Sequence, residues 1–134
     1  MDKTTIEKCL KVFPEIDKEI NRLETEIQKL KIYKEEKLKN KDFYGEAGIK
    51  SLFETADAVL GEYRTELNDL CTAQIKINKA LPKINDEQRK VIEVRLWNNQ
   101  ELPTKWSEVA EKLNYHRVYA ERVYQKTISF ILAS

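Results

Sequence analysis

Two long stretches of this sequence repeat apolar residues at alternating steps of three and four, and this repeat restricts the fold more than any other feature. The first stretch comprises Ile16, Ile20, Leu23, Ile27 and Leu30. The second continues for about 28 residues, or roughly 40 Å of helix, through Phe53, Ala56, Leu60, Tyr63, Leu67, Leu70, Gln74, Ile77 and Leu81. Such repeats predict long α-helices that each bury one stripe against a partner helix.

The repeat alone does not determine which helix each stripe packs against. The segment 39–50, KNKDFYGEAGIK, holds two of the three glycines and predicts a turn between the two helices. Helices joined by a short loop most simply form an antiparallel hairpin, although the same stripes would also fit a second copy of the chain. We expect residues 1–81 to be a helical coiled-coil or oligomerisation region, and we favour a homodimer.

Composition agrees with an all-α protein and excludes several classes of function. The chain has 35% charged residues, three glycines, three prolines and a formal net charge of +1. No apolar run is long enough for a membrane span, and the N-terminus lacks a signal-peptide core, so we expect a cytoplasmic protein. Cys9 and Cys71 are too far apart in the sequence to suggest a disulfide scaffold or a metal site, and we expect both to be reduced and mostly buried. Enzyme motifs are missing, so we expect no catalytic residues and no cofactors.

Two helix starts carry the spacing of a capping box, in which an N-cap side chain pairs with the residue three positions later. Thr4 with Glu7 predicts one for a short helix that reaches Phe13. Asn85 with Gln88 predicts another for the helix DEQRKVIEVRLW. The polar loop 98–103 then ends that helix.

The next segment predicts two helices with a very short connection, Trp106 to Leu113 and His116 to Lys126. Thr104 is placed to cap the first helix, and Asn114 occupies the turn, where a left-handed backbone is often required. Their inward faces comprise Val109, Ala110, Leu113, Ala120, Val123 and Thr127. This is the plan of a helix-turn-helix, whose second helix presents its outer face to the major groove of DNA.

The outer face of that second helix carries side chains that can read base edges. Arginine pairs with guanine, glutamine with adenine, glutamate accepts from cytosine, and valine contacts the thymine methyl group. The candidates for base contacts are Arg117, Val118, Glu121, Arg122 and Gln125. The candidates for phosphate contacts are Lys126, His116 and Lys105. The alternative is that these are ordinary solvated charges of an amphipathic helix.

The C-terminal segment resembles region 4 of bacterial sigma-70 factors. Matches to the first helix of that region are Leu81, Pro82, Gln88, Arg89, Val91, Ile92, Val94, Arg95, Leu96 and Trp97. Matches to its helix-turn-helix are Glu108, Val109, Ala110, Leu113, Arg117 and Val123. Departures include Asn114 in place of glycine, His116 in place of serine or threonine, and Glu121 and Arg122 in place of an Arg-Gln pair. The family's promoter specificity is therefore not carried over.

The order of the two predicted regions along the chain adds a second resemblance. A coiled coil followed by a sigma-4-like domain is similar to phage late transcription activators of the RinA and ArpU kind. This resemblance implies a DNA-binding domain over residues 82–134, double-stranded DNA as the ligand, and host RNA polymerase as a partner. Two alternatives stay open: a small terminase subunit, and a helical adaptor that binds RNA polymerase without specific DNA contact.

Overall fold

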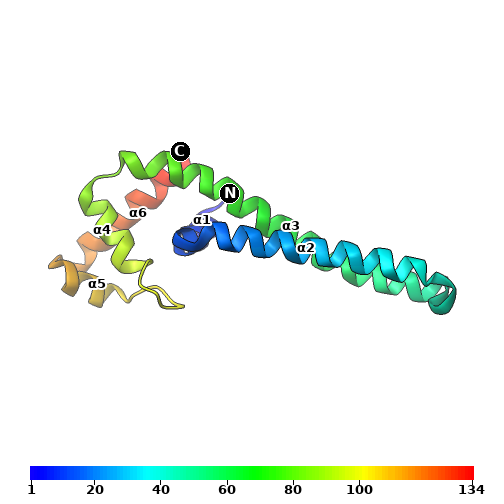
Figure 1. Cartoon of the computed structure of the whole chain (residues 1–134). Coiled ribbons are helices and arrows are strands. Elements are labelled where there is room, and N and C mark those ends of the chain that lie inside the picture. Colours follow the sequence, from blue (N-terminus) through cyan, green and yellow to red (C-terminus); the bar gives the residue numbers. More distant parts are fainter. The chain divides into compact units, whose positions relative to one another are not determined.

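A computed structural model describes all 134 residues and is entirely helical, with 86% of the chain in helices and no strand (Figure 1). The α-helices are α1 (Lys3–Val12), α2 (Ile16–Lys39), α3 (Lys41–Ala80), α4 (Asp86–Arg95), α5 (Trp106–Leu113) and α6 (Arg117–Ala133). Two 3-10 turns, η1 (Phe13–Glu15) and η2 (Leu81–Lys83), each contain a proline. The predicted all-α class with a long helix pair is confirmed. None of the helices combines the length and apolar character that crossing a membrane requires.

The chain divides into two compact units, and they do not follow the expected boundary at residue 81. The hairpin unit is Asp17–Leu70. The discontinuous unit combines Met1–Ile16 with Cys71–Ser134. The first helix of the chain therefore belongs with the C-terminal helices, because its apolar face packs there and not along the predicted coiled coil.

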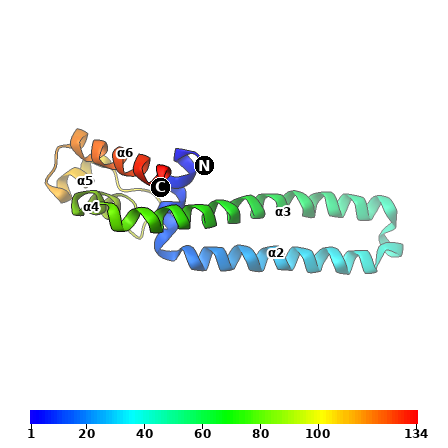
Figure 2. The ribbon, with the colours of Figure 1, turned by 90° about the horizontal axis from the view of Figure 1, so that it is seen from above.

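Within the hairpin unit, α2 and α3 lie side by side (Figure 2), and apolar residues of both stripes are buried. Its core residues are Leu23, Ile27, Ala56, Leu60 and Leu70. At the edge of the stripe, the Lys34 ammonium bonds Asp57 and lies 4.9 Å from the centre of the Phe53 ring. The stripes of these two helices thus pair within one chain, which is one of the two arrangements that the repeat allowed.

The turn of the hairpin falls inside the predicted segment but is shorter than expected. α2 ends at Lys39, and helical structure resumes at Lys41 instead of near Phe53. Within α3, Gly45 has φ 72° and ψ 170°, a non-helical conformation that divides the helix there. Backbone angles in this region are essentially restricted to glycine, because a Cβ atom would clash with the chain.

Substituting two of the three glycines of α3, those at positions 45 and 61, is expected to have opposite effects. Gly45→Ala should lower the free energy of unfolding of the hairpin unit by about 1–3 kcal/mol, since alanine is strained at this backbone conformation. Gly61→Ala is the matched control: the position is helical, and an added Cβ meets no atom within 4 Å. This change should raise stability by about 0.5–1 kcal/mol. Circular dichroism during urea denaturation measures both effects, and destabilisation by both variants alike would contradict the assigned role of Gly45.

In the discontinuous unit, α1 packs against α6. Ile6 and Leu10 of α1 are fully buried. The Tyr124 hydroxyl donates to Glu7 Oε2 at 2.8 Å, and Trp97 Nε1 donates to the Leu10 carbonyl oxygen at 2.7 Å. Both apolar burial and polar contacts therefore hold α1 on the C-terminal helices.

One of the three predicted caps is present. Asn85 and Gln88 form the full capping box of α4, with bonds of 2.8 and 3.0 Å. The prediction of Thr4 as the cap of the first helix is wrong, because Asp2 is the N-cap residue and its side chain accepts from the Thr5 N–H at 2.7 Å. Hydrogen bonding to this backbone N–H lowers the pKa of Asp2.

The prediction of Thr104 as the cap of α5 is also wrong. Lys105 is the N-cap residue of α5 and makes no side-chain capping bond. Thr104 instead joins the loop to α4: its backbone N–H donates to the Arg95 carbonyl oxygen at 2.8 Å. Its hydroxyl accepts from Asn98 Nδ2 at 2.7 Å. The Thr104 hydroxyl is therefore bonded within the loop and does not cap α5.

The last helix is longer than predicted. α6 continues past Lys126 to Ala133, and Ile128 and Ile131 are fully buried. The apolar end of the chain thus completes the core of the discontinuous unit. The two cysteines are free, but only Cys9 is buried; Cys71 is exposed, so the expectation of a buried thiol is wrong at that position.

Candidate nucleic-acid interface

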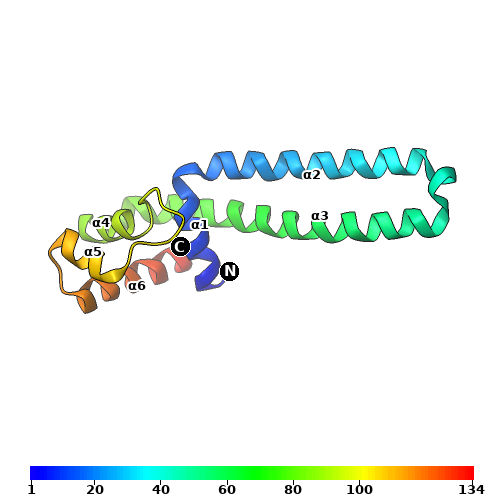
Figure 3. The same cartoon turned by 90° about the horizontal axis from the view of Figure 1, so that it is seen from below.

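The connection between α5 and α6 is a tight turn at Asn114. This residue has φ 57° and ψ 43°, the left-handed conformation predicted for it. The Tyr115 N–H donates to the Ala110 carbonyl oxygen at 2.9 Å, and the Asn114 N–H donates to Glu111 at 3.3 Å. Paired bonds of this kind satisfy the last carbonyl groups of a helix and end it abruptly. The turn therefore allows α6 to start after only three intervening residues and to leave in a new direction (Figure 3).

One face of α6 is buried against α4, α5 and α1. Its predicted inward residues Ala120, Val123 and Thr127 are all buried, and Thr127 satisfies its hydroxyl by donating to the Val123 carbonyl oxygen at 2.8 Å. Tyr124 is also buried and meets the edge of the Trp106 ring, with 5.1 Å between ring centres. This packing fixes the rotation of α6 about its axis.

Tyr124 connects the core to α1 through its hydroxyl. Burial raises the pKa of Tyr124, and the hydrogen bond to Glu7 raises it further. The phenol therefore stays protonated and donates to the Glu7 carboxylate. Near it, the Arg95 guanidinium lies 4.5 Å from the centre of the Trp106 ring and donates to the Thr104 carbonyl oxygen. These contacts thus link α1 to α6, and α4 to the loop before α5 and to Trp106 of α5.

The opposite face of α6 is open to solvent and carries the candidate residues. Seven of the eight are exposed: Lys105, His116, Arg117, Val118, Arg122, Gln125 and Lys126. Glu121 is half-buried. Apart from Lys105, the N-cap of α5, and His116, the N-cap of α6, all of them lie within α6. The structure therefore places six of them on one helix, with His116 at its start and Lys105 at the start of α5, and keeps them outside the protein core.

The charges on this face are only partly neutralised by the protein itself. Arg117 Nε forms an ion pair with Glu121 Oε1 at 3.1 Å, one turn away. Exposed pairs of this spacing contribute only about 0.3–0.5 kcal/mol, so another anion can compete for the guanidinium. Arg122 and Lys126 have no ion pair with the protein. The helix thus offers three cations against one carboxylate.

Two contacts at this face were not predicted from the sequence. Gln125 Oε1 accepts from the Lys3 ammonium of α1. Tyr119, also exposed, donates to Glu87 Oε1 of α4 at 2.6 Å, and this bond raises the pKa of Tyr119. The partners lie 122 and 32 residues away along the chain. No local sequence signal indicates either pairing.

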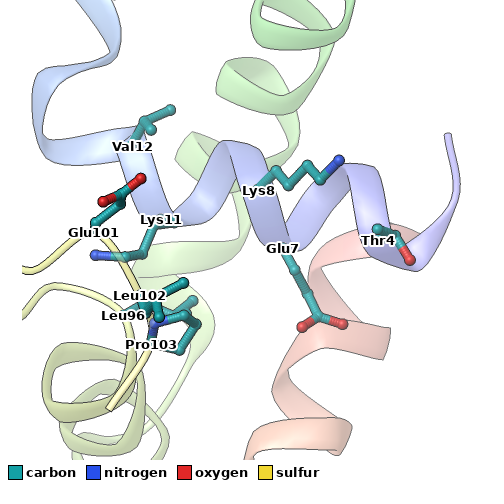
Figure 4. Close-up of a pocket in the computed structure, with 9 residues that line it drawn as sticks. All are labelled: Thr4, Glu7, Lys8, Lys11, Val12, Leu96, Glu101, Leu102 and Pro103. Carbon is teal, nitrogen blue, oxygen red and sulfur yellow. The ribbon is translucent and has the colours of Figure 1, made fainter.

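A hollow of about 500 Å³ lies between α1 and the loop before α5, within the same unit (Figure 4). Its lining includes Lys11, Leu96, Leu102 and Pro103. The Lys11 ammonium is already bonded to Asn98 Oδ1 at 3.0 Å and to the Gln100 carbonyl oxygen at 2.5 Å. Lys11 is thus engaged in holding the loop, and we place the candidate site on α6 instead.

Side chains suited to a metal ion do not cluster anywhere in the chain: no group of three or more His, Cys, Asp or Glu residues is arranged to hold one. Comparison of the chain with protein-family models, with characterised proteins and with solved structures found no match. A function is therefore inferred from the geometry of the chain itself and from its motif resemblance to sigma-70 region 4.

Proposed function

We propose that the protein is a transcriptional regulator of a phage or mobile element, which binds duplex DNA through a sigma-4-like helix-turn-helix formed by α5 and α6. The observation that carries this proposal is the division of α6 into a packed face and an open face bearing Arg122 and Lys126. The packed face of α6 and the left-handed turn at Asn114 hold the helix in place. The helix is therefore suited to enter the major groove as a rigid element.

The open face supplies the chemistry for reading base pairs. Arg122 and Arg117 can each donate two bonds to guanine, and Val118, 66% exposed, can contact a thymine methyl group. Lys126, with Lys105 at the start of α5, is suited to phosphate contacts, which hold the protein in register. Arg117 would exchange its ion pair with Glu121 for a base or a phosphate.

The resemblance to sigma region 4 and to phage late activators supports a role at promoters beside host RNA polymerase. In that role, the hairpin unit would offer a surface to other proteins. Its apolar stripes are used within the chain, so the proposal places no dimer contact at that seam.

Replacing Arg122 and Lys126 separately tests the proposal, because the two residues are assigned different tasks. Arg122→Ala should weaken binding to a preferred sequence by about 1–3 kcal/mol and relax the base preference at one position. Lys126→Ala should weaken binding to all sequences alike and reduce the slope of log affinity against log salt by about one. Sequence selection from a random duplex pool identifies the preferred site, and electrophoretic shifts at several salt concentrations measure both effects.

Lys39→Ala in the hairpin unit is the matched control, since Lys39 is also an exposed cation and lies far from α6 in the sequence. It should change neither affinity nor base preference. If all three variants bound DNA as the unsubstituted protein does, α6 would not be the recognition helix.

A second candidate, the polymerase-binding adaptor, is favoured by one observation. Val118 and Phe130 leave apolar surface exposed on α6, at 66% and 40% of their area. Exposed apolar side chains suit a protein partner as well as a thymine methyl group. Binding of purified RNA polymerase that persists at high salt, with no measurable affinity for duplex DNA, would favour the adaptor, because phosphate neutralisation always produces a salt dependence.

A further inference from the structure

Lys3 at the start of α1 lies against the proposed recognition helix, far from it in sequence. Its ammonium donates to Gln125 Oε1, a side chain that the proposed function assigns to base contact. Both side chains are exposed, so the pair lies at the surface of the interface and not in the core.

The rest of α1 keeps this contact in place. Ile6 and Leu10 are buried, and the Tyr124 hydroxyl, one residue before Gln125, donates to Glu7 of α1. The backbone of α1 is further held at its start, where Asp2 caps the helix. Lys3 therefore projects from an anchored helix whose distance from Gln125 is set by buried contacts.

We propose that Lys3 is a positioning residue of the DNA interface, which orients the Gln125 amide so that its NH₂ group, and not its oxygen, faces the bases. This inference rests on the proposed function and specifies the base class that Gln125 reads. With the amide oxygen turned toward the Lys3 ammonium, Gln125 presents its NH₂ group to the bases as a donor.

The orientation determines which bases are accepted. A freely rotating glutamine selects adenine by two bonds, because its oxygen accepts from N6 and its nitrogen donates to N7. Guanine has acceptors at both N7 and O6 and is rejected by that arrangement. An NH₂ group placed at the N7 position is satisfied by the N7 of either purine, and an oxygen turned toward Lys3 does not select adenine N6 over guanine O6. The protein should therefore accept adenine and guanine at the position that Gln125 contacts.

Sequence selection from a random duplex pool tests the assignment with four proteins. The unsubstituted chain should select either purine at one position, and Gln125→Ala should lose that preference. Lys3→Ala should convert the same position to adenine, with discrimination of about fivefold or more against guanine. Lys3→Arg should keep the purine preference, since a guanidinium also donates to the amide oxygen.

Lys8→Ala is the matched control on the same helix. Lys8 is exposed and lines the hollow beside the loop, so its removal should leave the selected sequence unchanged. A structural role of Lys3 in holding α1 would lower stability or affinity but would not convert a purine position into an adenine position.

The two proposals fail in different ways. If Arg122→Ala relaxes base preference while Lys3→Ala selects the same sequences as the unsubstituted chain, the positioning role is overturned and the DNA-binding function stands. If the unsubstituted chain selects no sequence and binds no random duplex at about 50 mM salt, where phosphate contacts are strong, both proposals are overturned.

Discussion

Replacing Leu10 by alanine is expected to lower the free energy of unfolding of the discontinuous unit by about 2–5 kcal/mol. Leu10 is fully buried, although it lies in a ten-residue helix near the N-terminus. Removing its branched end leaves a cavity that the surrounding helices cannot fill completely, and the lost contacts add to the lost transfer free energy. Both tryptophans, Trp97 and Trp106, lie in the same unit. Urea denaturation followed by tryptophan fluorescence therefore reports this unit directly.

Leu102→Ala is the matched control for this prediction. It deletes the same atoms in the same unit, but the Leu102 side chain is 74% exposed. Its effect should stay within about 0.5 kcal/mol, as for most surface substitutions. Equal effects of the two substitutions would mean that α1 is an appended arm and not part of the core. The placement of Lys3 beside Gln125 would then lose its support as well.

Features with a local cause were predictable from the sequence. The heptad repeat predicted the two long helices because burial of an apolar stripe depends on spacing alone. Asn114 was predictable in the turn because few residues tolerate a left-handed backbone, and the Asn85 capping box because both of its partners lie within three residues. The open face of α6 follows from the same periodicity, since the inward positions were identified from their apolar and small side chains.

Features that depend on distant partners were not predictable. The sequence pattern of α1 shows an apolar face, but it does not show that this face packs on α6 instead of on the hairpin. Thr4 and Thr104 both had the chemistry of a cap. Asp2, and not Thr4, caps the first helix. The Thr104 hydroxyl accepts a hydrogen bond from Asn98 in the loop and does not cap α5. The contact between Lys3 and Gln125 depends on the packing of α1 and therefore had no signal in either segment.

The end of the chain provides the second large expected effect. The apolar segment after Lys126 was compatible with a core or with a surface that covers a partner, and the structure places Ile128 fully inside. Ile128→Ala should therefore lower the free energy of unfolding of the discontinuous unit by about 2–5 kcal/mol. Because α6 carries the proposed recognition face, the variant should also lose DNA affinity at temperatures where the unit is partly unfolded, and regain it on cooling.

Ile75→Ala is the matched control for Ile128→Ala, because it makes the same substitution at an exposed position. It removes the same atoms from a residue of α3 in the same unit, but Ile75 is 58% exposed. Its effect should be within about 0.5 kcal/mol. A small effect of Ile128→Ala, accompanied by loss of binding to RNA polymerase, would place the end of α6 at a partner surface and favour the adaptor over the DNA-binding regulator. A large effect on stability makes the end of α6 part of the core that supports the exposed face carrying Arg122 and Gln125.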